Sequence, residues 1–449
     1  MRLFKKKQCI DILDTVLSAH NEAGSFLEKG RVQETSDLLE QCQQSAMAVG
    51  SLIEGSEGEG TEAVRILEEY CEKLYIMYAD LTEGKTEGWH AVKKGLDRLI
   101  LKVISEIRGR IKDERMVVFL PYKISMWDSL EGIWKKCCSE DGCIPVVMPI
   151  PYYDKNADGT PGEKHYEIDM FPGEVPVVSC EDMDLETEHP ESIYIHNPYD
   201  MANHVTSVDP RFYSSRLKNY TDDLVYIPYF VLEEPELGDS SAVETMEYLV
   251  TVPGVINAHR VIVQSEAMKE VYVDIMTRYT RPDMRPYWEK KIEGTGSPKI
   301  EKVKTIRRED FDIPSEWKDL IFKRDGEIRK VVLYNTSVSG VMHYREKVIE
   351  KIKSVIREFR RHDDVVLLWR PHPLMEATVR SIDPELEKEY HDLVNAYRDG
   401  GFGIYDDSPD MYMAIAVSDA YYGDSSSVMT LYRYTGKPVM VQNYLLCSC

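Results

Sequence analysis

Three consecutive serines near the C-terminal end of the sequence could hold a phosphate group. Ser425, Ser426 and Ser427 follow a short apolar run that favours a strand, and they precede apolar residues at helical spacing that end near Gly436. The pattern predicts a strand, a polar loop and a helix, whose free backbone N–H groups and serine hydroxyls would face a bound anion. The alternative is a serine cap that binds nothing, since serine is an ordinary N-cap residue.

Further candidate groups lie in the same part of the chain. His372 follows the apolar run VVLLW, and the two prolines beside it restrict its backbone. Because polar residues that leave the carboxyl ends of parallel strands meet at one sheet edge, Arg370 or His372 could contact a phosphate that the serine loop also holds. A solvated histidine at a strand end is the alternative. Asp410 begins the helix predicted before the serine stretch, and we expect it to cap that helix.

A second polar cluster follows an apolar strand in the middle of the chain. His196 and Asp200 lie in the segment YIHNPYDMANHV, together with asparagine and tyrosine side chains. Ligands of open α/β sheets bind outside the carboxyl ends of the strands, so this cluster is well placed for chemistry. A histidine that is merely solvated is an equally open interpretation.

Several common site types lack their sequence pattern. The chain has no G-x-G-x-x-G, P-loop, H-E-x-x-H or G-x-S-x-G motif in the required context, which removes the best evidence for nicotinamide redox chemistry, P-loop hydrolysis and zinc proteolysis. The nine cysteines do not form the paired spacing of a zinc site. We therefore expect neither a metal nor a cofactor.

The length and the net charge of the chain limit the classes of protein to which it could belong. The 449 residues suggest two or three domains, and the formal net charge of −23 argues against nucleic acid as the main partner. The N-terminal segment is a poor signal peptide, and no apolar run reaches the roughly 18 residues of a spanning helix. These features favour a cytoplasmic protein.

The positions of the apolar residues predict the architecture. Apolar residues recur at three and four over 1–112, which predicts an α-helical N-terminal region that either covers a neighbouring domain or binds a partner. Alternating strands and helices predict a first Rossmann-like domain over 113–293 and a second over 330–449, joined by a crossing over 294–329. The predicted fold class is α/β, with two Rossmann-like domains preceded by helices.

Four segments together carry a resemblance to a known family. RPHPLM at 370–375, SPDMY at 408–412, SDAYYGDSSSVMTLYRYTGKPVM at 418–440 and GTGSPK at 294–299 resemble the CDP-glycerol glycerophosphotransferases of teichoic acid synthesis. That family has the GT-B fold of two Rossmann-like domains. The resemblance covers the chain from about residue 113 onward, and the family's W-H-G-T-P-type motif is replaced here by YIHNPYD.

The resemblance implies a reaction and roles for particular residues. His372 and Ser425 to Ser427 would contact the diphosphate of CDP-glycerol, with Arg370 beside them and Asp410 near the nucleotide. A hydroxyl of a polymer or lipid-linked acceptor would attack the phosphorus that bears glycerol and release CMP. A general base must take the hydroxyl proton, and His196 is the candidate, with Asp200 to orient it.

The same resemblance implies a location and leaves two alternatives open. It implies a cytoplasmic enzyme, with a peripheral contact at the inner face of the cell membrane. A GT-B glycosyltransferase or sugar-nucleotide epimerase that uses a UDP-sugar would need the same phosphate-binding groups. The third hypothesis is a non-catalytic nucleotide- or protein-binding protein whose working surface is the helical region.

Overall fold

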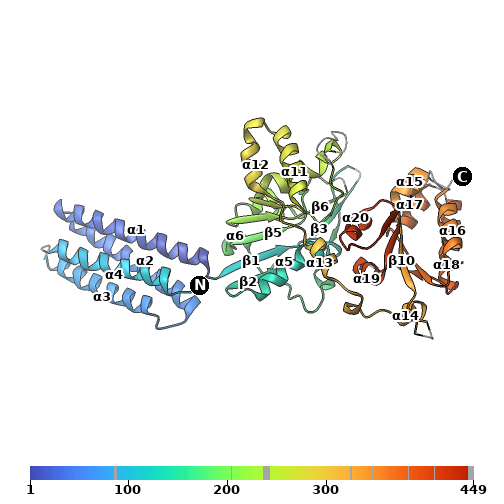
Figure 1. Cartoon of the computed structure of the whole chain (residues 1–449). Coiled ribbons are helices and arrows are strands. Elements are labelled where there is room, and N and C mark those ends of the chain that lie inside the picture. Colours follow the sequence, from blue (N-terminus) through green and yellow to red (C-terminus); the bar gives the residue numbers. More distant parts are fainter. Residues whose placement is uncertain are drawn as a thin grey trace.

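The computed structural model describes residues 1–84, 88–156, 158–203, 205–235, 243–323, 326–344, 347–382, 384–408 and 410–442. A helical bundle, a first α/β domain and a second α/β domain follow one another along an elongated molecule (Figure 1). The predicted fold class is therefore confirmed. Within the described ranges, no helix has the length and hydropathy needed to cross a membrane.

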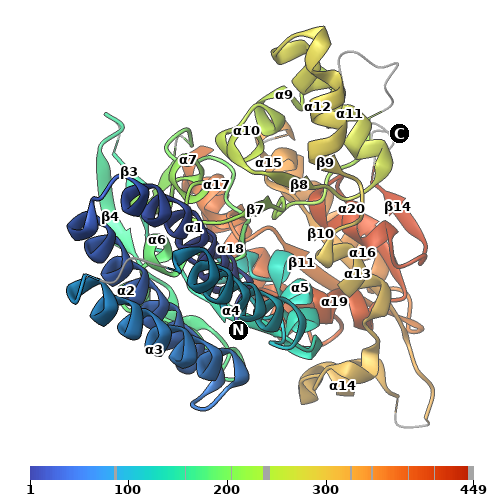
Figure 2. The ribbon, with the colours of Figure 1, turned by 90° about the vertical axis from the view of Figure 1, so that its left-hand side faces the viewer.

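Four amphipathic helices form the N-terminal bundle. They are α1 (Leu3–Glu28), α2 (Val32–Glu57), α3 (Glu62–Thr82) and α4 (Trp89–Gly109). Each packs on its sequence neighbours, and α1 also packs on α4, so that one apolar core lies between all four (Figure 2). The apolar stripe predicted from the three-and-four spacing is the face that each helix buries.

A six-stranded parallel sheet forms the centre of the first domain. Its order is β2 (Cys143–Val147), β1 (Arg115–Leu120), β5 (Ser192–Ile195), β7 (Asp223–Tyr226), β8 (Arg260–Ile262) and β9 (Ile292–Glu293). Its helices are α5 (Asp128–Ser139), α6 (Leu185–Glu188), α7 (Ser214–Leu217), α9 (Glu247–Val250), α10 (Pro253–Asn257), α11 (Glu266–Tyr279) and α12 (Arg285–Lys291). β4 (Pro161–His165), β3 (Tyr152–Lys155) and β6 (Thr206–Val208) form a small antiparallel sheet, in which β3 and β4 come after β2 in the chain and β6 comes after β5.

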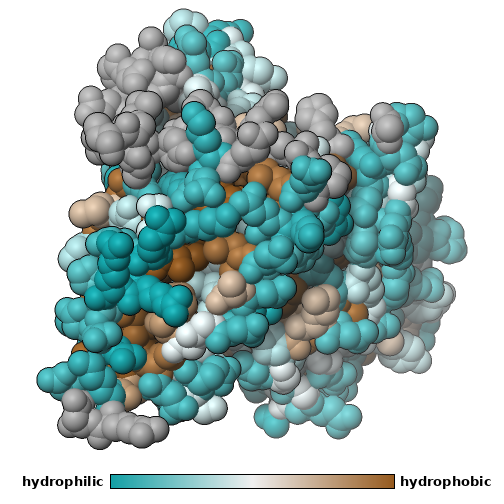
Figure 3. Space-filling view, turned by 90° about the vertical axis from the view of Figure 1, so that its right-hand side faces the viewer, coloured by the Kyte–Doolittle hydropathy of each residue, from teal (hydrophilic) through white to brown (hydrophobic). Residues whose placement is uncertain are grey.

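A five-stranded parallel sheet forms the centre of the second domain. Its order is β12 (Ile404–Tyr405), β11 (Val365–Pro371), β10 (Lys330–Thr336), β13 (Ala420–Gly423) and β14 (Val439–Val441). Its helices are α15 (Val338–Tyr344), α16 (Lys347–Phe359), α17 (Met375–Ile382), α18 (Pro384–Asp399), α19 (Met411–Val417) and α20 (Ser427–Arg433). Both faces of the sheet are buried, as expected for parallel strands. The surface of the molecule on the side turned away from the bundle is mostly hydrophilic, with apolar residues in its recesses (Figure 3).

The segment between the two sheets joins the domains. It contains α13 (Pro298–Thr305) and α14 (Ser315–Ile321), and α13 packs on α5 of the first domain and on α19 and α20 of the second. Asp128 of α5 receives a hydrogen bond of 2.6 Å from the Tyr412 hydroxyl and lies 3.0 Å from Lys299 Nζ. Polar contacts therefore tie both domains to the same helix.

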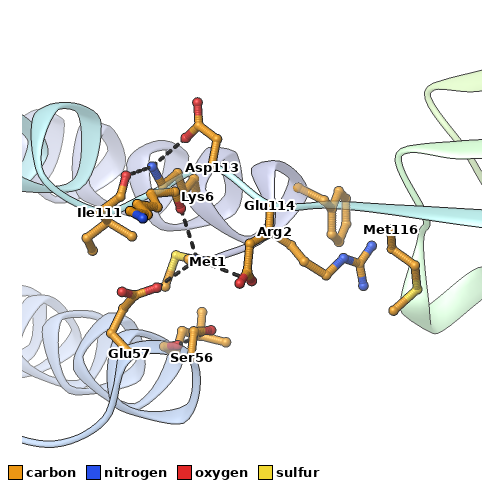
Figure 4. Close-up of polar contacts among 12 residues, drawn as sticks. Met1, Arg2, Lys6, Ser56, Glu57, Ile111, Asp113, Glu114 and Met116 are labelled. Carbon is orange, nitrogen blue, oxygen red and sulfur yellow. Dashed lines mark hydrogen bonds and ion pairs between the residues drawn. The ribbon is translucent and has the colours of Figure 1, made fainter. Parts of the chain in front are cut away.

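The bundle is attached to the amino-terminal edge of the first sheet. Arg2 forms ion pairs with Glu188 and with Glu191, the residue before β5, and both Arg2 and Glu191 are buried. Lys6 bonds to Asp113 and to the carbonyl of Ile111, just before β1 (Figure 4). The helices consequently extend away from the α/β domains and do not cover the carboxyl ends of the strands, which corrects the expectation of a helical cap (Figure 1).

Candidate functional site

The predicted donor-binding residues surround the switch point of the second sheet. The chain runs from β10 to β11 and β12 on one side, then crosses to β13 on the other side of β10. Ligands of open parallel sheets bind at such a reversal, outside the carboxyl ends of the strands. His372 follows β11 and Ser425 to Ser427 follow β13, so the structure brings these two groups to one edge, on either side of β10.

His372 offers a hydrogen-bond donor at this edge. Its ring is exposed, and Nδ1 accepts the backbone N–H of Leu374 at 3.1 Å. The neutral imidazole then carries its proton on Nε2, which makes no hydrogen bond to the residues that the structure describes. Partial burial lowers the pKa of His372, so the ring is neutral near pH 7. An uncharged Nε2–H is thus available to a phosphate oxygen.

The three serines of the loop differ in what their hydroxyls contact. Ser426 is the N-cap of α20: its Oγ accepts the N–H of Met429 at 3.2 Å and donates to Asn335 Oδ1 at 2.8 Å. The cap interpretation therefore holds for Ser426. Ser425 and Ser427 are exposed, and within the described part of the chain their hydroxyls make no hydrogen bond. Of the three serines in this loop, Ser425 and Ser427 are therefore the two whose hydroxyls can meet a ligand.

A buried ion pair fixes the start of the serine loop, and the sequence did not reveal it. Asp424 accepts the backbone N–H of Ser337 at 2.7 Å and pairs with Lys351 of α16. Lys351 is 7% exposed although it lies among the apolar residues of its helix. A lysine inside an apolar stripe was the signal available in the sequence. Because the lysine neutralises Asp424, this carboxylate does not repel an anion beside Ser425.

Gly423 permits the turn from β13 into this loop. A Cβ atom on Gly423 would lie 2.2 Å from the carbonyl oxygen of Asn335 in β10, a distance that no side chain tolerates. The glycine therefore lets the end of β13 lie close beside Asn335 in the neighbouring strand.

Arg370 has a structural role that differs from the predicted one. Its guanidinium is buried, forms an ion pair with Asp406 and donates to the carbonyl of Ser408 at 2.8 Å. These contacts hold the loop that follows β12. Nη1 and Nη2 of Arg370 have these partners inside the domain, and a contact between Arg370 and phosphate stays a prediction.

Asp410 caps α19, as the sequence predicted. Its Oδ1 accepts the backbone N–H of Tyr412 at 2.7 Å, and the side chain is exposed. A contact with the nucleotide stays a prediction.

His196 lies inside the first domain with both ring nitrogens occupied. Its side chain is 0% exposed; Nε2 accepts the N–H of Tyr122 at 3.1 Å, and Nδ1 lies 3.1 Å from the carbonyl oxygen of Met126 and 2.9 Å from Ser129 Oγ. Burial lowers the pKa of His196 to about 3. The lone pair of the neutral ring is used by Tyr122, so His196 cannot take a proton from an acceptor in this structure.

Asp200 does not orient His196. Its carboxylate accepts the N–H of Ser214 at 2.9 Å and the hydroxyl of Ser214 at 2.7 Å, at the start of α7. Burial raises the pKa of Asp200. The predicted pair of His196 and Asp200 is therefore wrong: the residues are close in sequence, but each is bonded to a different element.

The carboxyl edge of the first sheet carries a cation that sequence reasoning missed. Lys123 is half-buried just beyond β1, and its Nζ lies 4.7 Å from the centre of the Tyr152 ring and 5.5 Å from that of Tyr122. The signal was its place shortly after the apolar run MVVFL, from which Pro121 and Tyr122 separate it. This edge also borders a reversal of strand order, between β1 and β5.

Comparisons with known proteins find similarity at the level of structure. No protein-family model and no curated protein matches the chain. Similar solved structures include the wall teichoic acid polymerase TagF, with 14% identity over 83% of this chain and 79% of that chain and a TM-score of 0.38. The UDP-GlcNAc 2-epimerase of Neisseria meningitidis is similar over 73% of this chain and 82% of that chain, with 10% identity and a TM-score of 0.41. A putative UDP-N-acetylglucosamine 2-epimerase of Listeria monocytogenes is similar over 74% and 80%, with 12% identity and a TM-score of 0.42.

Proposed function

We propose that the chain transfers glycerol phosphate from CDP-glycerol to a hydroxyl of a teichoic-acid-like or other cell-surface glycopolymer acceptor and releases CMP. The observation that supports this proposal is the set of free donors at the switch point of the second sheet. Three donors lie at one edge of the second sheet: the Nε2–H of His372 and the hydroxyls of Ser425 and Ser427. The nearby carboxylate of Asp424 is neutralised by Lys351. Hydrogen-bond donors without a competing free carboxylate suit a diphosphate.

The reaction needs positioning and charge stabilisation. The acceptor oxygen forms a bond to the phosphorus that bears glycerol, and the bond from that phosphorus to the bridging oxygen breaks. The electron pair leaves with CMP, and the acceptor proton passes to a base other than His196. Donors directed at the diphosphate stabilise the charge that develops on the leaving phosphate, and no covalent enzyme intermediate is required.

The proposed acceptor places the enzyme at a membrane. A polymer or lipid-linked acceptor is presented at the inner face of the cell membrane, so we propose a cytoplasmic enzyme with a peripheral contact there. Donor, acceptor and membrane are its only proposed partners, and CDP-glycerol is a substrate and not a cofactor.

Thermal unfolding with nucleotides tests the donor. We expect CDP-glycerol and CDP to raise the unfolding temperature more than UDP-glucose or UDP-N-acetylglucosamine does. A ligand at about 100 times its dissociation constant adds roughly 2.7 kcal/mol to stability, which gives a clear shift. The shift should be lost in His372→Ala and kept in His362→Ala, which removes an exposed histidine from the same domain.

Each outcome separates the hypotheses. Release of CMP together with a new phosphodiester supports the transferase. Preference for a uridine nucleotide would replace it with a glycosyltransferase or epimerase. No response to any nucleotide would leave the binding-protein hypothesis.

A further inference from the structure

Three side chains that can ligate a metal ion meet on the hairpin of β3 and β4. Asp154 belongs to β3, and Glu163 and His165 belong to β4. One ligand atom from each residue lies within 4.8 Å of the ligand atoms of the other two. Because zinc holds nitrogen and oxygen ligands at about 2.0–2.2 Å, and two ligands of one ion therefore lie roughly 3–4 Å apart, small side-chain rotations would bring all three onto one ion.

The pairing of the strands puts these side chains on one face of the small sheet. Glu163 and His165 are two residues apart, so their side chains point to the same side of β4. Tyr152 lies opposite His165, and Asp154 follows two residues further along β3, where the register shifts. β3 also pairs with β6 on its other side. Paired strands therefore carry the three ligands and fix their spacing.

The imidazole of His165 is already oriented. Its ring stacks on the ring of Tyr152, with 4.9 Å between the ring centres, and the Tyr152 hydroxyl donates to Glu167 at 2.7 Å. His165 Nε2 lies 2.8 Å from Asp154 Oδ2. A metal ion bound to these two atoms would replace the proton that they share, and the proton of the neutral ring would then lie on Nδ1.

The two carboxylates carry charge that no nearby cation neutralises. Within the described ranges, neither Asp154 nor Glu163 has a lysine or arginine nitrogen within 4.0 Å, and the exposed Glu163 carboxylate makes no hydrogen bond. Two such charges favour a divalent ion. Since Ca²⁺ and Mg²⁺ prefer oxygen ligands throughout, the nitrogen of His165 favours a transition-metal ion instead.

A second set of the same three ligand types differs in its charge. Glu376, Glu387 and His391 also bring their ligand atoms within 4.8 Å of one another. Arg380, however, lies between the two carboxylates, 3.1 Å from Glu376 and 2.6 Å from Glu387. A metal ion would have to displace this guanidinium, so the second set serves as a natural control for the first.

We propose that Asp154, Glu163 and His165 bind a divalent transition-metal ion of the Zn²⁺ class. The site is separate from the donor-binding residues of the second domain, and it does not depend on the proposed function. Three protein ligands leave at least one position of the ion open to water or to an oxygen of another ligand. The spacing of the residues gave no signal in the sequence, because Asp154 and His165 are 11 residues apart and meet only through strand pairing.

Titration calorimetry with ZnCl₂ tests the proposal on the full-length protein. The protein is first treated with a chelator, and the buffer contains no phosphate or nucleotide, since both bind the ion. We expect one Zn²⁺ site that Glu163→Gln weakens at least about tenfold, because the loss of even a residue that only supports a ligand costs 10–100-fold in affinity. The carboxylate of Glu163 is exposed and unbonded among the described residues, so this variant keeps the fold.

Matched variants separate the two sets of ligands. His165→Gln keeps a side-chain donor for Asp154 and should lose affinity as Glu163→Gln does. His391→Gln makes the same change in the set that Arg380 neutralises and should bind Zn²⁺ as the unchanged protein does. Ca²⁺ and Mg²⁺ should bind the unchanged protein more weakly than Zn²⁺.

Co²⁺ distinguishes this site from the nine cysteines of the chain. Thiolate ligands give Co²⁺ a strong near-ultraviolet absorption that nitrogen and oxygen ligands do not give. We expect visible Co²⁺ bands without that absorption, and their loss in His165→Gln.

Four outcomes would overturn the proposal. They are no Zn²⁺ binding to the unchanged protein, equal affinity in Glu163→Gln and the unchanged protein, the same loss of affinity in His391→Gln as in His165→Gln, and a thiolate absorption that accounts for all bound Co²⁺. Binding of Ca²⁺ as tight as that of Zn²⁺ would overturn the assignment to a transition metal.

Discussion

His372 and His196 show how two histidines in the same local context reach opposite states. Each directly follows an apolar strand of a parallel sheet. His372 remains exposed with a free Nε2–H, because among the described residues its ring forms a hydrogen bond only with the nearby N–H of Leu374. His196 is enclosed, because Tyr122 and Met126 come to it from a segment some 70 residues away. The availability of a side chain for chemistry therefore depends on distant partners.

The Lys351 and Asp424 pair gives a prediction at the scale of single residues. Lys351→Met leaves a largely buried carboxylate without its cation, so we expect the free energy of unfolding of the second domain to fall by about 3–5 kcal/mol. This change in the free energy of unfolding is measured by urea unfolding. Asp424→Asn in the same chain should restore part of the loss, because the uncompensated charge is then gone.

Lys353 supplies the control for this prediction. It lies two residues further along α16, is more exposed and pairs with Glu389. Lys353→Met should cost about 1 kcal/mol or less. Equal losses for the two lysines would contradict the burial argument.

At the scale of elements, the imidazole of His196 connects the segment after β5 with the end of β1 and with the turn before α5. His196 belongs to the segment after β5, and its partners Tyr122, Met126 and Ser129 belong to the segment after β1. These two strands border the switch point of the first sheet. Loss of the ring would therefore loosen the edge that carries Lys123.

Acid should destabilise the first domain through His196. Burial lowers the pKa of His196 to about 3, whereas an unfolded histidine has a pKa of about 6.5. Between these values the unfolded state binds one proton more, so stability is complete above pH 6.5 and falls as the pH drops toward 3. The loss is at most about 5 kcal/mol at the acid end.

Calorimetry over pH 4 to 8 checks this expectation. The unfolding transition of the first domain should depend less steeply on pH in His196→Gln than in the unchanged protein. His20, buried in the bundle with a lowered pKa, provides an internal comparison, since the bundle transition should keep its own acid dependence in that variant. An identical slope for the first domain in both proteins would refute a buried neutral His196.

At the scale of the whole molecule, the bundle and the second domain are attached at different places on the first domain. The bundle meets the amino-terminal edge of the sheet through Arg2 and Lys6, and the second domain is joined through α13 (Figures 1 and 4). The candidate donor residues His372, Ser425 and Ser427 follow strands at the carboxyl edge of the second sheet. The bundle therefore does not act as a lid over them.

Arg2→Ala should loosen the junction without changing the candidate sites. Glu191 would lose its buried cation but keep the N–H groups of Phe4 and Met116, so we expect a local loss of about 1–3 kcal/mol. Hydrogen exchange should accelerate roughly 5- to 150-fold in the first turn of α1 and over 185–192.

Arg31→Ala, which removes an exposed arginine at the start of α2, should leave these rates unchanged. CDP-glycerol stabilisation should be the same in both variants. A smaller stabilisation by CDP-glycerol in Arg2→Ala, or faster hydrogen exchange in its second domain, would show that the bundle is coupled to the donor-binding edge.

The sequence by itself determined the features that depend on local spacing. Apolar periodicity predicted the four helices and the two parallel sheets. Short-range capping chemistry predicted the caps made by Asp410 and Ser426, because a capping bond reaches only two or three residues along the chain. The place of His372 and the serines at one edge also followed from strand order. Tertiary structure alone decided which polar groups are free. Arg370, His196 and Asp200 form hydrogen bonds or ion pairs within the domains, whereas within the described ranges Lys123 lies over aromatic rings, because burial and partners come from segments that the fold brings together over long distances.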